Sequence, residues 1–365
     1  MLQNKTIAVV VPAYNEDKQI GMVIETLPDF VDKLIIINDG STDATADVVQ
    51  HYIERAEKTI AVKPISDSVT PGKYNRAEVV LHQQSKEEQK YFTPSIIANE
   101  SPETDRIILI RHLKNAGVGA AIATGYKWCK DHAIDCTAVM AGDGQMDPAE
   151  LESICTPIIE ENVDYVKGNR LIHRSAWFVV PKIRYFGNSI LSILTKIASG
   201  YWHVSDTQTG YTAISHKALN AIRIHKIYKR YGMPNDMLVK LNIAFCSLKE
   251  VEIKPVYNIG EQSKMNIFRV IPSISWLLCK SFLKRLWAKY LFRDFHPLFL
   301  LYHLAFLLLS LSVPYGFKII SLMLFARQAI NPVTLIAFMF LFTSGFQSLL
   351  FAMWMDIQDN ERLYR

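Results

Sequence analysis

Four short stretches of the sequence combine glycine with carboxylate, amide or hydroxyl side chains. They are residues 12–16 (Pro-Ala-Tyr-Asn-Glu), 38–43 (Asn-Asp-Gly-Ser-Thr-Asp), 115–119 (Asn-Ala-Gly-Val-Gly) and 141–147 (Ala-Gly-Asp-Gly-Gln-Met-Asp). Glycine lets the backbone approach a ligand closely, and the N–H groups at the start of a helix bind anions. If the fold brings these stretches together, they predict a crevice for phosphate and sugar groups.

Each stretch follows a run of apolar, largely β-branched residues. The runs are 7–11, 34–37, 107–110 and 137–140, and helix-like segments separate them. Continuous apolar strands that alternate with helices predict an α/β fold with a mainly parallel, Rossmann-like sheet. Ligands bind such sheets outside the carboxyl ends of the strands, which is where all four stretches fall.

No single stretch identifies the chemistry. The string Asp-Gly-Ser-Thr at 39–42 is also typical of a turn and a helix cap. Residues 117–119 resemble the start of a dinucleotide fingerprint, but Ile122 occupies the third glycine position and no acidic residue follows at the expected place. A nicotinamide enzyme is therefore disfavoured.

The composition is that of a folded, intracellular protein. Half of the 365 residues are apolar, which excludes a disordered chain and allows one large domain or two ordinary ones. The five cysteines form no Cys-x-x-Cys pair, so a zinc ribbon or a thioredoxin motif is disfavoured and a reduced compartment is indicated.

Basic residues gather in one segment. Residues 264–293 contain seven Lys or Arg and no Asp or Glu, whereas the rest of the chain has 33 basic and 35 acidic residues. Proteins that bind nucleic acid spread their basic residues over a reading face, so we expect no nucleic-acid partner.

Two long runs without charged residues follow, 297–317 and 329–355. At about 1.5 Å per residue, each run can cross the roughly 30 Å hydrocarbon layer of a bilayer. We predict two membrane-spanning helices, and a buried helical hairpin is the alternative. More basic residues flank the runs (Lys284, Arg285, Lys289, Arg293, Arg362 and Arg365) than lie between them (Lys318 and Arg327). The positive-inside rule then predicts an integral membrane protein with residues 1–262 and both termini in the cytoplasm.

The segment before the first run alternates apolar and basic residues at helical spacing. It covers 267–295 and includes Trp276 and Trp287. Such a segment is typical of helices that lie among lipid headgroups, with a break expected at Pro272. A solvated helix face is the alternative.

These patterns predict four segments. An α/β domain at 1–262 is followed by basic amphipathic helices at 263–296, two transmembrane helices at 297–355 and a cytoplasmic tail at 356–365. Within the domain, the proline-rich stretch 59–105 interrupts the alternation of strands and helices. We interpret it as an insertion, either an extended excursion or a hairpin, that contacts partner subunits.

In this order, the motifs resemble the GT-A glycosyltransferases of family 2, and specifically the polyprenyl-phosphate branch related to dolichyl-phosphate mannose synthase. The resemblance covers 5–52 and 106–291, and the paired C-terminal spans agree with it. It implies a GT-A fold, a nucleotide-sugar donor linked to UDP or GDP, a polyprenyl phosphate acceptor such as undecaprenyl or dolichyl phosphate, a lipid bilayer around the spans, and inversion at the anomeric carbon. A homo-oligomer is left open.

The resemblance also implies which residues bind the donor. Those expected to contact the nucleotide are Pro12, Ala13, Tyr14, Glu16, Asp39, Asn115, Gly119 and Asp143. Asp143 and Gln145 are expected to hold Mg²⁺ or Mn²⁺ on the diphosphate. The family often has Asp-x-Asp here, but Ala141 replaces the first Asp. One or two carboxylates suffice for such an ion when diphosphate oxygens and water complete its shell, and Asp147 is a candidate helper.

Later segments resemble the part of the family that handles the sugar and the acceptor. Asp206, Gln208 and Gly210 are expected near the donor sugar, and Asp143, Asp236 and Arg170 are the candidate catalytic residues. The candidates for gripping the lipid phosphate are Arg170, Arg184, Ser263 and Lys264. Cations suit phosphate oxygens, although any single arginine can equally be a surface charge.

The expected reaction is the metal-dependent transfer of a sugar from a nucleoside diphosphate to a polyprenyl phosphate. One alternative is a glycosyltransferase that extends a lipid-linked or polysaccharide glycan at a hydroxyl group. Another is a membrane scaffold that binds nucleotide sugar without catalysis, which Ala141 favours. A processive polysaccharide synthase is disfavoured because the chain lacks a Gln-x-x-Arg-Trp motif and has only two predicted spans.

Overall fold

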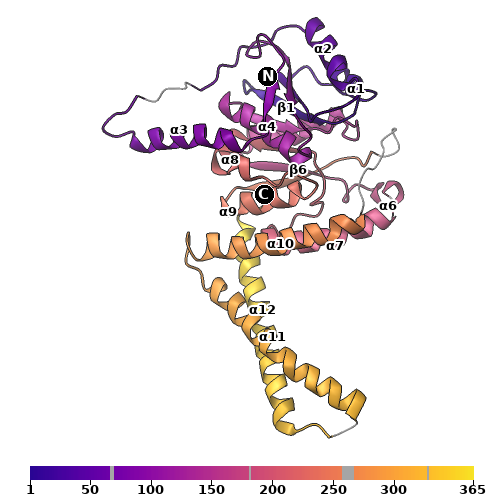
Figure 1. Cartoon of the computed structure of the whole chain (residues 1–365), viewed down its shortest axis with the longest axis vertical. Coiled ribbons are helices and arrows are strands. Elements are labelled where there is room, and N and C mark those ends of the chain that lie inside the picture. Colours follow the sequence, from indigo (N-terminus) through magenta and orange to yellow (C-terminus); the bar gives the residue numbers. More distant parts are fainter. Residues whose placement is uncertain (66–69, 181, 257–266, 327–328) are drawn as a thin grey trace.

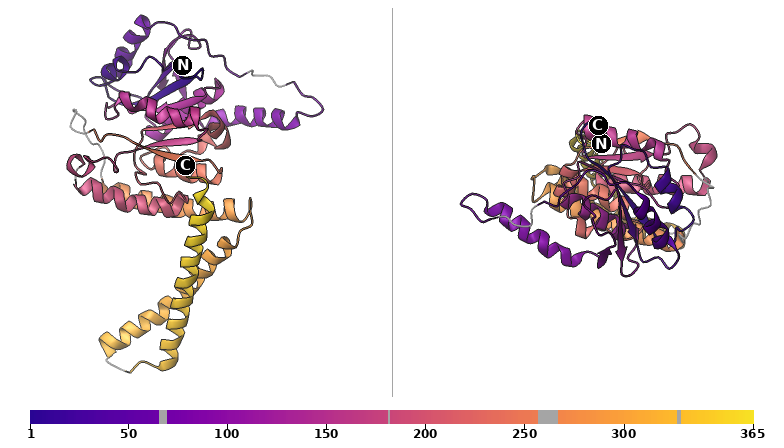
Figure 2. Two further views of the ribbon diagram at one scale, coloured as in Figure 1. Left: turned by 180° about the vertical axis from the view of Figure 1, so that it is seen from behind. Right: turned by 90° about the horizontal axis from the view of Figure 1, so that it is seen from above.

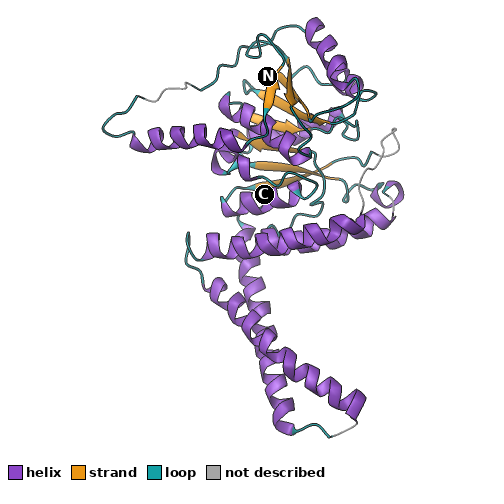
Figure 3. Cartoon of the chain, viewed as in Figure 1, coloured by secondary structure: helices purple, strands orange, loops and turns teal. Residues whose placement is uncertain are grey.

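The computed structural model describes residues 1–65, 70–180, 182–256, 267–326 and 329–365. An eight-stranded sheet lies at the centre of an α/β domain, and helices cover both of its faces (Figure 1, Figure 3). Two long helices extend away from this domain as a hairpin (Figure 1). The described chain thus consists of an α/β domain and a helical hairpin.

The sheet is mainly parallel. Its strands are β1 (Ile7–Ala13), β2 (Lys33–Asn38), β3 (Ser95–Ile97), β4 (Ile107–His112), β5 (Cys136–Val139), β6 (Tyr165–Asn169), β7 (Thr212–Ser215) and β8 (Leu248–Glu252), in the order β3-β4-β2-β1-β5-β7-β6-β8. β4, β2, β1 and β5 are parallel, as are β6 and β8, whereas β3 and β7 run antiparallel to their neighbours. The predicted α/β fold and its four apolar strands are confirmed.

Helices fill the connections between the strands. They are α1 (Ile20–Glu25), α2 (Thr45–Arg55), α3 (Arg76–Glu88), α4 (Val118–Asp131), α5 (Leu151–Glu160), α6 (Ala176–Val179), α7 (Lys182–Ser199), α8 (His216–Ala221), α9 (Met233–Ile243), α10 (Ile267–Tyr290), α11 (Pro297–Ser321) and α12 (Pro332–Glu361). Short 3₁₀ turns occur at η1 (Gln89–Tyr91), η2 (Pro148–Glu150) and η3 (Ile224–Lys226), and a π-helical turn, η4 (Leu322–Ala326), follows α11.

Two hydrophobic cores lie on opposite faces of the sheet. Val9 of β1 packs in one core with α1, α2 and α5, and Val10 packs in the other with α4, α8 and α9. Both side chains are fully buried. A strand that is covered on both faces cannot alternate apolar and polar residues, which explains the continuous apolar runs.

The insertion at 59–105 forms a helical arm. It contains α3, η1 and the short edge strand β3, and α3 projects sideways from the domain (Figure 2). The sequence suggested an extended excursion or a hairpin, and the structure shows an excursion that is largely helical. Residues 76–88 contain no proline or glycine and are rich in Glu and Gln, which favour helix, and none of them is buried.

The two ends of this arm lie side by side. Thr59 donates its N–H to the carbonyl of Thr104 at 2.8 Å, and Val62 donates to Glu103 at 3.0 Å. The buried ammonium of Lys33 on β2 donates to the carbonyls of Glu103 and Asp105 at 2.9 and 2.8 Å. Burial lowers the pKa of Lys33 to about 8, and nearby Asp105 partly offsets this effect. The base of the arm is thus fixed to the sheet.

The basic amphipathic segment forms one helix, α10, which runs past Pro272 without a break. Proline removes only one backbone hydrogen bond, and α10 gains packing along α7 and α9. Figures 1 and 2 show α7 and α10 side by side beneath the sheet. The predicted break at Pro272 is therefore wrong.

Two basic residues of α10 point into the protein. The Arg285 guanidinium donates to both carboxylate oxygens of Asp356 on α12 at 2.7 Å, and its Nε donates to the carbonyl of Ala198 on α7 at 3.0 Å. Lys289 donates to Asn242 on α9 at 3.2 Å and pairs with Asp359 on α12. Arg285 and Lys289 are almost completely buried, so the expectation that they contact lipid headgroups is wrong. We call this group of residues the anchor cluster.

The C-terminal residues also contact the α/β domain. Leu248 of β8 donates its N–H to the carbonyl of Leu363 at 2.7 Å, and Arg365 donates its N–H to the carbonyl of Leu248 at 2.9 Å. Residues 362–365 therefore extend the edge of the sheet, whereas the sequence suggested a separate tail. Since α10 precedes the hairpin, both ends of the hairpin meet the same domain (Figure 1).

Two helices of the hairpin are candidate membrane spans. The helices Pro297–Leu324 and Pro332–Glu361 each contain an 18-residue window with a mean hydropathy of 1.8. Their large apolar side chains are mostly exposed; Phe317 is 75% exposed and Phe340 is 65% exposed. A buried core hairpin would cover such side chains, so these exposures disfavour that alternative.

We expect Asp356→Leu to lower the free energy of unfolding by about 3–5 kcal/mol, because Arg285 would keep its buried charge without a partner. The double variant Arg285→Met/Asp356→Leu should recover most of this loss, since both charges are then gone. The measurement is the thermal unfolding midpoint of the purified chain in detergent.

Asp29→Leu is the matched control, because Asp29 is fully exposed beside Arg106 at 3.9 Å. It should leave the midpoint unchanged. A midpoint for Asp356→Leu equal to that of the wild type would show that the anchor cluster does not stabilise the fold.

Candidate functional site

The four predicted stretches meet at the carboxyl ends of the parallel strands. Asp39, directly after β2, donates its N–H to the carbonyl of Ala13 at the end of β1, at 2.9 Å. Gly142, after β5, donates its N–H to the carbonyl of Pro12 at 3.3 Å. The stretch after β1 is thus bonded to those after β2 and β5. Adjacent parallel strands place their ends together, as the sequence predicted.

Side chains bind the first two stretches to each other. Asn15 has a left-handed backbone with φ of 56°. Its N–H donates to the Ser41 hydroxyl at 3.0 Å, and its side-chain oxygen accepts from the N–H of Thr42 at 2.9 Å. The N–H of Glu16 donates to the Thr45 hydroxyl at 3.0 Å. The side chain of Tyr14, which precedes Asn15, is exposed at the surface.

The Asp39 carboxylate is directed into the protein. It accepts from the N–H of Ala116 at 2.9 Å and from the N–H of Gly117 at 2.8 Å. It also lies 2.7 Å from Nδ1 of His112, the last residue of β4. Asp39 therefore holds the 115–119 turn in place. His112 was not predicted as a site residue, since no motif marks a histidine at the end of an apolar strand.

The glycines of the 115–119 turn allow the chain itself to approach. A Cβ at Gly117 would lie 2.5 Å from the carbonyl oxygen of Lys229, and one at Gly119 would lie 2.0 Å from that of Tyr228. The N–H of Gly119 donates to Lys229 at 3.0 Å. A protein carbonyl therefore caps the start of α4, where the sequence suggested that a phosphate would bind. Asn115 remains exposed beside Gly40.

Asp236, a predicted catalytic residue, is buried at the start of α9 and has partners within the protein. It accepts from the N–H of Tyr228 at 2.8 Å and pairs with Lys240. Burial lowers the pKa of Lys240, and Asp236 opposes this shift. These bonds fix the segment around Tyr228 that covers Gly119. In the structure, Asp236 therefore holds this segment in place.

Asp143 and Gln145 lie on a turn after β5 and are partly exposed. Asp143 accepts from the N–H of Gln145 at 3.1 Å, and Gly144 between them has φ of 75°. Across the described ranges of the chain, no three His, Cys, Asp or Glu residues form a metal-binding group. One carboxylate and one amide oxygen nevertheless fit Mg²⁺ or Mn²⁺ that takes its remaining ligands from a diphosphate and water.

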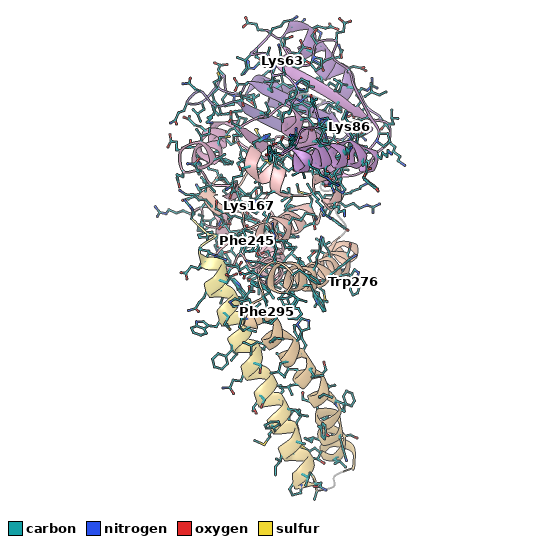
Figure 4. All side chains as sticks on the ribbon, turned by 90° about the vertical axis from the view of Figure 1, so that its left-hand side faces the viewer. Lys63, Lys86, Lys167, Phe245, Trp276 and Phe295 are labelled. Carbon is teal, nitrogen blue, oxygen red and sulfur yellow. The ribbon has the colours of Figure 1, made fainter. Side chains whose placement is uncertain are left out.

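A largely buried charged network surrounds Asp206. Arg170, after β6, donates from Nε and Nη2 to the Asp206 carboxylate at 2.9 and 3.2 Å. Burial tends to raise the pKa of Asp206, but Arg170 holds it below the usual range. Burial lowers the pKa of nearby Lys167 to about 8, although Asp206 and Glu250 oppose this shift. Figure 4 shows Lys167 within the α/β domain.

The Asp206–Gly210 segment connects this network to the turn that carries Asp143. A Cβ at Gly210 would contact the Met146 methyl group at 3.4 Å, and the hydroxyl of Tyr211 donates to the carbonyl of Asp147 at 3.0 Å. Gln208 donates to the side-chain oxygen of Asn235 at 2.9 Å. The predicted donor-sugar residues therefore lie next to the predicted metal turn.

Glu250 on β8 is a second residue that the sequence analysis missed. Its carboxylate accepts from the N–H groups of Ser205 and Asp206 and from the Asn169 side chain, at 2.9–3.1 Å. Of the predicted acceptor residues, Arg170 lies in the site, Arg184 lies on α7 with its side chain outside the described part, and Ser263 and Lys264 lie outside the described residues.

We expect Gly119→Ala to lower the free energy of unfolding by about 1–3 kcal/mol, because the new Cβ would overlap a backbone carbonyl and force the 228–232 segment away. Limited proteolysis should then cut this segment faster. Gly187→Ala on α7 is the matched control, since no atom lies within 4 Å of its added Cβ. It should keep or raise stability. Equal unfolding midpoints for the two variants would contradict the packing described here.

A comparison with protein families agrees with this arrangement. Residues 8–73 and 86–223, more than half of the chain, match the family described as "Glycosyl transferase family 2". The two matched segments contain all four strand-end stretches as well as Arg170, Asp206 and Gln208. The gap between the segments falls within the helical arm.

Curated relatives cover most of the chain. A UDP-N-acetylglucosamine–dolichyl-phosphate N-acetylglucosaminyltransferase of Methanococcus voltae is 28% identical over 257 residues, which are 70% of this chain and 88% of that protein. A dolichyl-phosphate beta-glucosyltransferase of Trichomonas vaginalis is 21% identical over 281 residues, which are 73% and 69% of the two chains.

Among solved structures, glucosyl-3-phosphoglycerate synthase from Mycobacterium tuberculosis in complex with UDP is 18% identical. The matched region covers 77% of this chain and 80% of the synthase chain, with a TM-score of 0.46. The α/β domain has the GT-A-like architecture that the motifs predicted, a mixed sheet dominated by parallel strands. The strand-end turns within the family match lie together at one edge of that sheet. The chain belongs to glycosyl transferase family 2.

Proposed function

We propose that this chain transfers a sugar from a nucleoside diphosphate to a polyprenyl phosphate at a membrane surface. The observation that carries this proposal is the joining of a family 2 site to an apolar hairpin through the anchor cluster. The two relatives named for dolichyl-phosphate acceptors support the lipid substrate. A screen of nucleotide-sugar donors would identify the sugar and distinguish UDP from GDP.

In the proposed reaction, a phosphate oxygen of the lipid attacks the anomeric carbon and forms a new C–O bond. The bond between that carbon and the diphosphate breaks, and the nucleoside diphosphate leaves with the electron pair. Direct displacement inverts the anomeric carbon. A phosphate monoester, with a second pKa near 6, is mostly dianionic at neutral pH, so no base is needed to activate it. The buried position of Asp236, with its internal partners, is compatible with a reaction that uses no such base.

A bound Mg²⁺ or Mn²⁺ at Asp143 and Gln145 would neutralise charge that develops on the leaving diphosphate. Asp206 keeps Arg170 oriented through two hydrogen bonds, which leaves the guanidinium fixed beside the donor-sugar segment. We propose that Arg170 faces the acceptor phosphate, and that Arg184, Ser263 and Lys264 contribute further phosphate contacts.

The hairpin and the helices beneath the sheet support a location in the bilayer. The exposed face of α10 carries Trp276, Leu283 and Trp287, which suit the level of the headgroups. Figure 4 labels Trp276 on this helix. Because both ends of the hairpin meet the α/β domain, two crossings would leave this domain and the C-terminus on the same side. Lys280 and Lys284 are exposed on α10, on the same side as the α/β domain. By the positive-inside rule, these lysines favour a cytoplasmic location for that domain.

The proposed function predicts that the chain forms a lipid-linked product. Membranes that contain the chain, labelled nucleotide sugars, Mg²⁺ and polyprenyl phosphate should yield a sugar phosphate that is extracted by organic solvent and cleaved by mild acid. Asp143→Ala should lower the rate at least about 100-fold, because charge on the leaving group would lose its metal.

Asp29→Asn is the control and should retain the wild-type rate, because Asp29 is exposed and more than 100 residues from Asp143 in the sequence. A labelled sugar on a glycan hydroxyl would support the alternative that the chain extends a glycan. No turnover with any donor, together with nucleotide-sugar binding, would support the scaffold alternative.

The second prediction concerns the metal. Because Asp143 and Gln145 are the two predicted ligands on this turn, Mn²⁺ should bind weakly alone and at least about tenfold more tightly with UDP or GDP present, as measured by titration calorimetry. Ala141→Asp adds a carboxylate to the same turn and should tighten binding of Mn²⁺ alone. Tight binding by the wild type without nucleotide, or an unchanged affinity for Ala141→Asp, would place the metal elsewhere.

A further inference from the structure

His112 makes a buried side-chain contact at the site. Its ring and the Asp39 side chain are 0% and 4% exposed. Nδ1 lies 2.7 Å from Asp39, and Nε2 lies 2.9 Å from the hydroxyl of Thr124 on α4. The ring therefore connects the ends of β2 and β4 to the helix that follows the 115–119 turn.

The direction of the bond to Asp39 follows from chemistry. An ionised carboxylate only accepts hydrogen bonds, so Nδ1 must carry the proton. At the other nitrogen, the Thr124 hydroxyl has two options: it donates to Nε2, or it accepts from Nε2 and donates to the carbonyl of Ala120 at 3.1 Å. Both arrangements keep the Nδ1–H bond to Asp39.

Within the described part of the chain, Asp39 uses most of its acceptor capacity internally. Oδ1 accepts from His112 and from Ala116, and Oδ2 accepts from Gly117. A carboxylate has about four lone-pair positions, so one remains, on Oδ2. The direction of this position depends on the rotation of the carboxylate, which the bond from His112 fixes together with the two N–H groups of the turn.

We propose that His112 is a positioning residue for nucleotide recognition: it fixes the Asp39 carboxylate so that the remaining Oδ2 position meets a donor group of the nucleotide. This inference rests on the proposed function, because it takes a nucleoside diphosphate as the ligand. His112 itself touches no substrate. Its effect is on donor affinity and leaves the transfer step unchanged.

Two amide variants test the proposal. The Asn side chain places its N–H₂ near the position of Nδ1, whereas the Gln side chain places it near Nε2. His112→Asn should bind UDP or GDP, whichever the wild type prefers, within about threefold of the wild-type Kd. His112→Gln should bind it roughly tenfold more weakly, because it loses a hydrogen bond to a charged group. The measurement is calorimetry on the full chain in detergent with Mn²⁺.

Steady-state rates and spectroscopy separate positioning from general destabilisation. The KM for the donor should rise in His112→Gln while kcat stays within about twofold. Nitrogen-15 spectra of the wild type should show a proton on Nδ1 of His112. His132→Phe is the matched control, since His132 stacks on Trp128 with ring centroids 3.8 Å apart near the far end of α4. It should leave nucleotide affinity unchanged.

Equal nucleotide affinities for the Asn and Gln variants would overturn the proposal, as would an unprotonated Nδ1. If the wild type binds nucleotide and the two variants differ but no glycolipid forms, the proposed function fails and the role of His112 stands. If the wild type binds neither UDP nor GDP, both are wrong.

Discussion

The buried ion pair between Arg285 and Asp356 determines how the two parts of this chain are held together. It joins α10 to α12 and, through the carbonyl of Ala198, to α7. In the proposed reaction, the acceptor lipid has a long isoprenoid tail that stays in the bilayer, so the donor site must be kept at a fixed height above it. A charge pair without access to water provides a rigid joint for this purpose, because separating it is costly.

Within the α/β domain, most polar groups at the strand ends are used to shape the site. Asp39 holds a turn, Asp236 holds the segment that covers that turn, and Glu250 holds the segment that carries Asp206. Tyr14, Asp143 and Gln145 at this edge keep exposed surface. A preorganised set of polar groups of this kind suits electrostatic stabilisation of a leaving diphosphate.

The sequence identified the elements whose patterns are local. Strands buried on both faces produce continuous apolar runs, and the polar turns after β1, β2, β4 and β5 were found from residue type alone. It did not identify features that depend on distant partners. Arg285 and Lys289 looked like headgroup ligands because Asp356 and Asp359 are far away in the chain. The role of Gly119 likewise depends on Tyr228, and the role of His112 on Asp39.

The closed base of the helical arm has a consequence for how this protein can vary. Since residues 59–62 pair with 103–104 and Lys33 fixes both Glu103 and Asp105, the two ends of the arm meet at the sheet. The entropy lost on closing such a loop rises only with the logarithm of its length. The arm is therefore a module: evolution or an engineer can lengthen, shorten or exchange it while β2 and β4 keep their register.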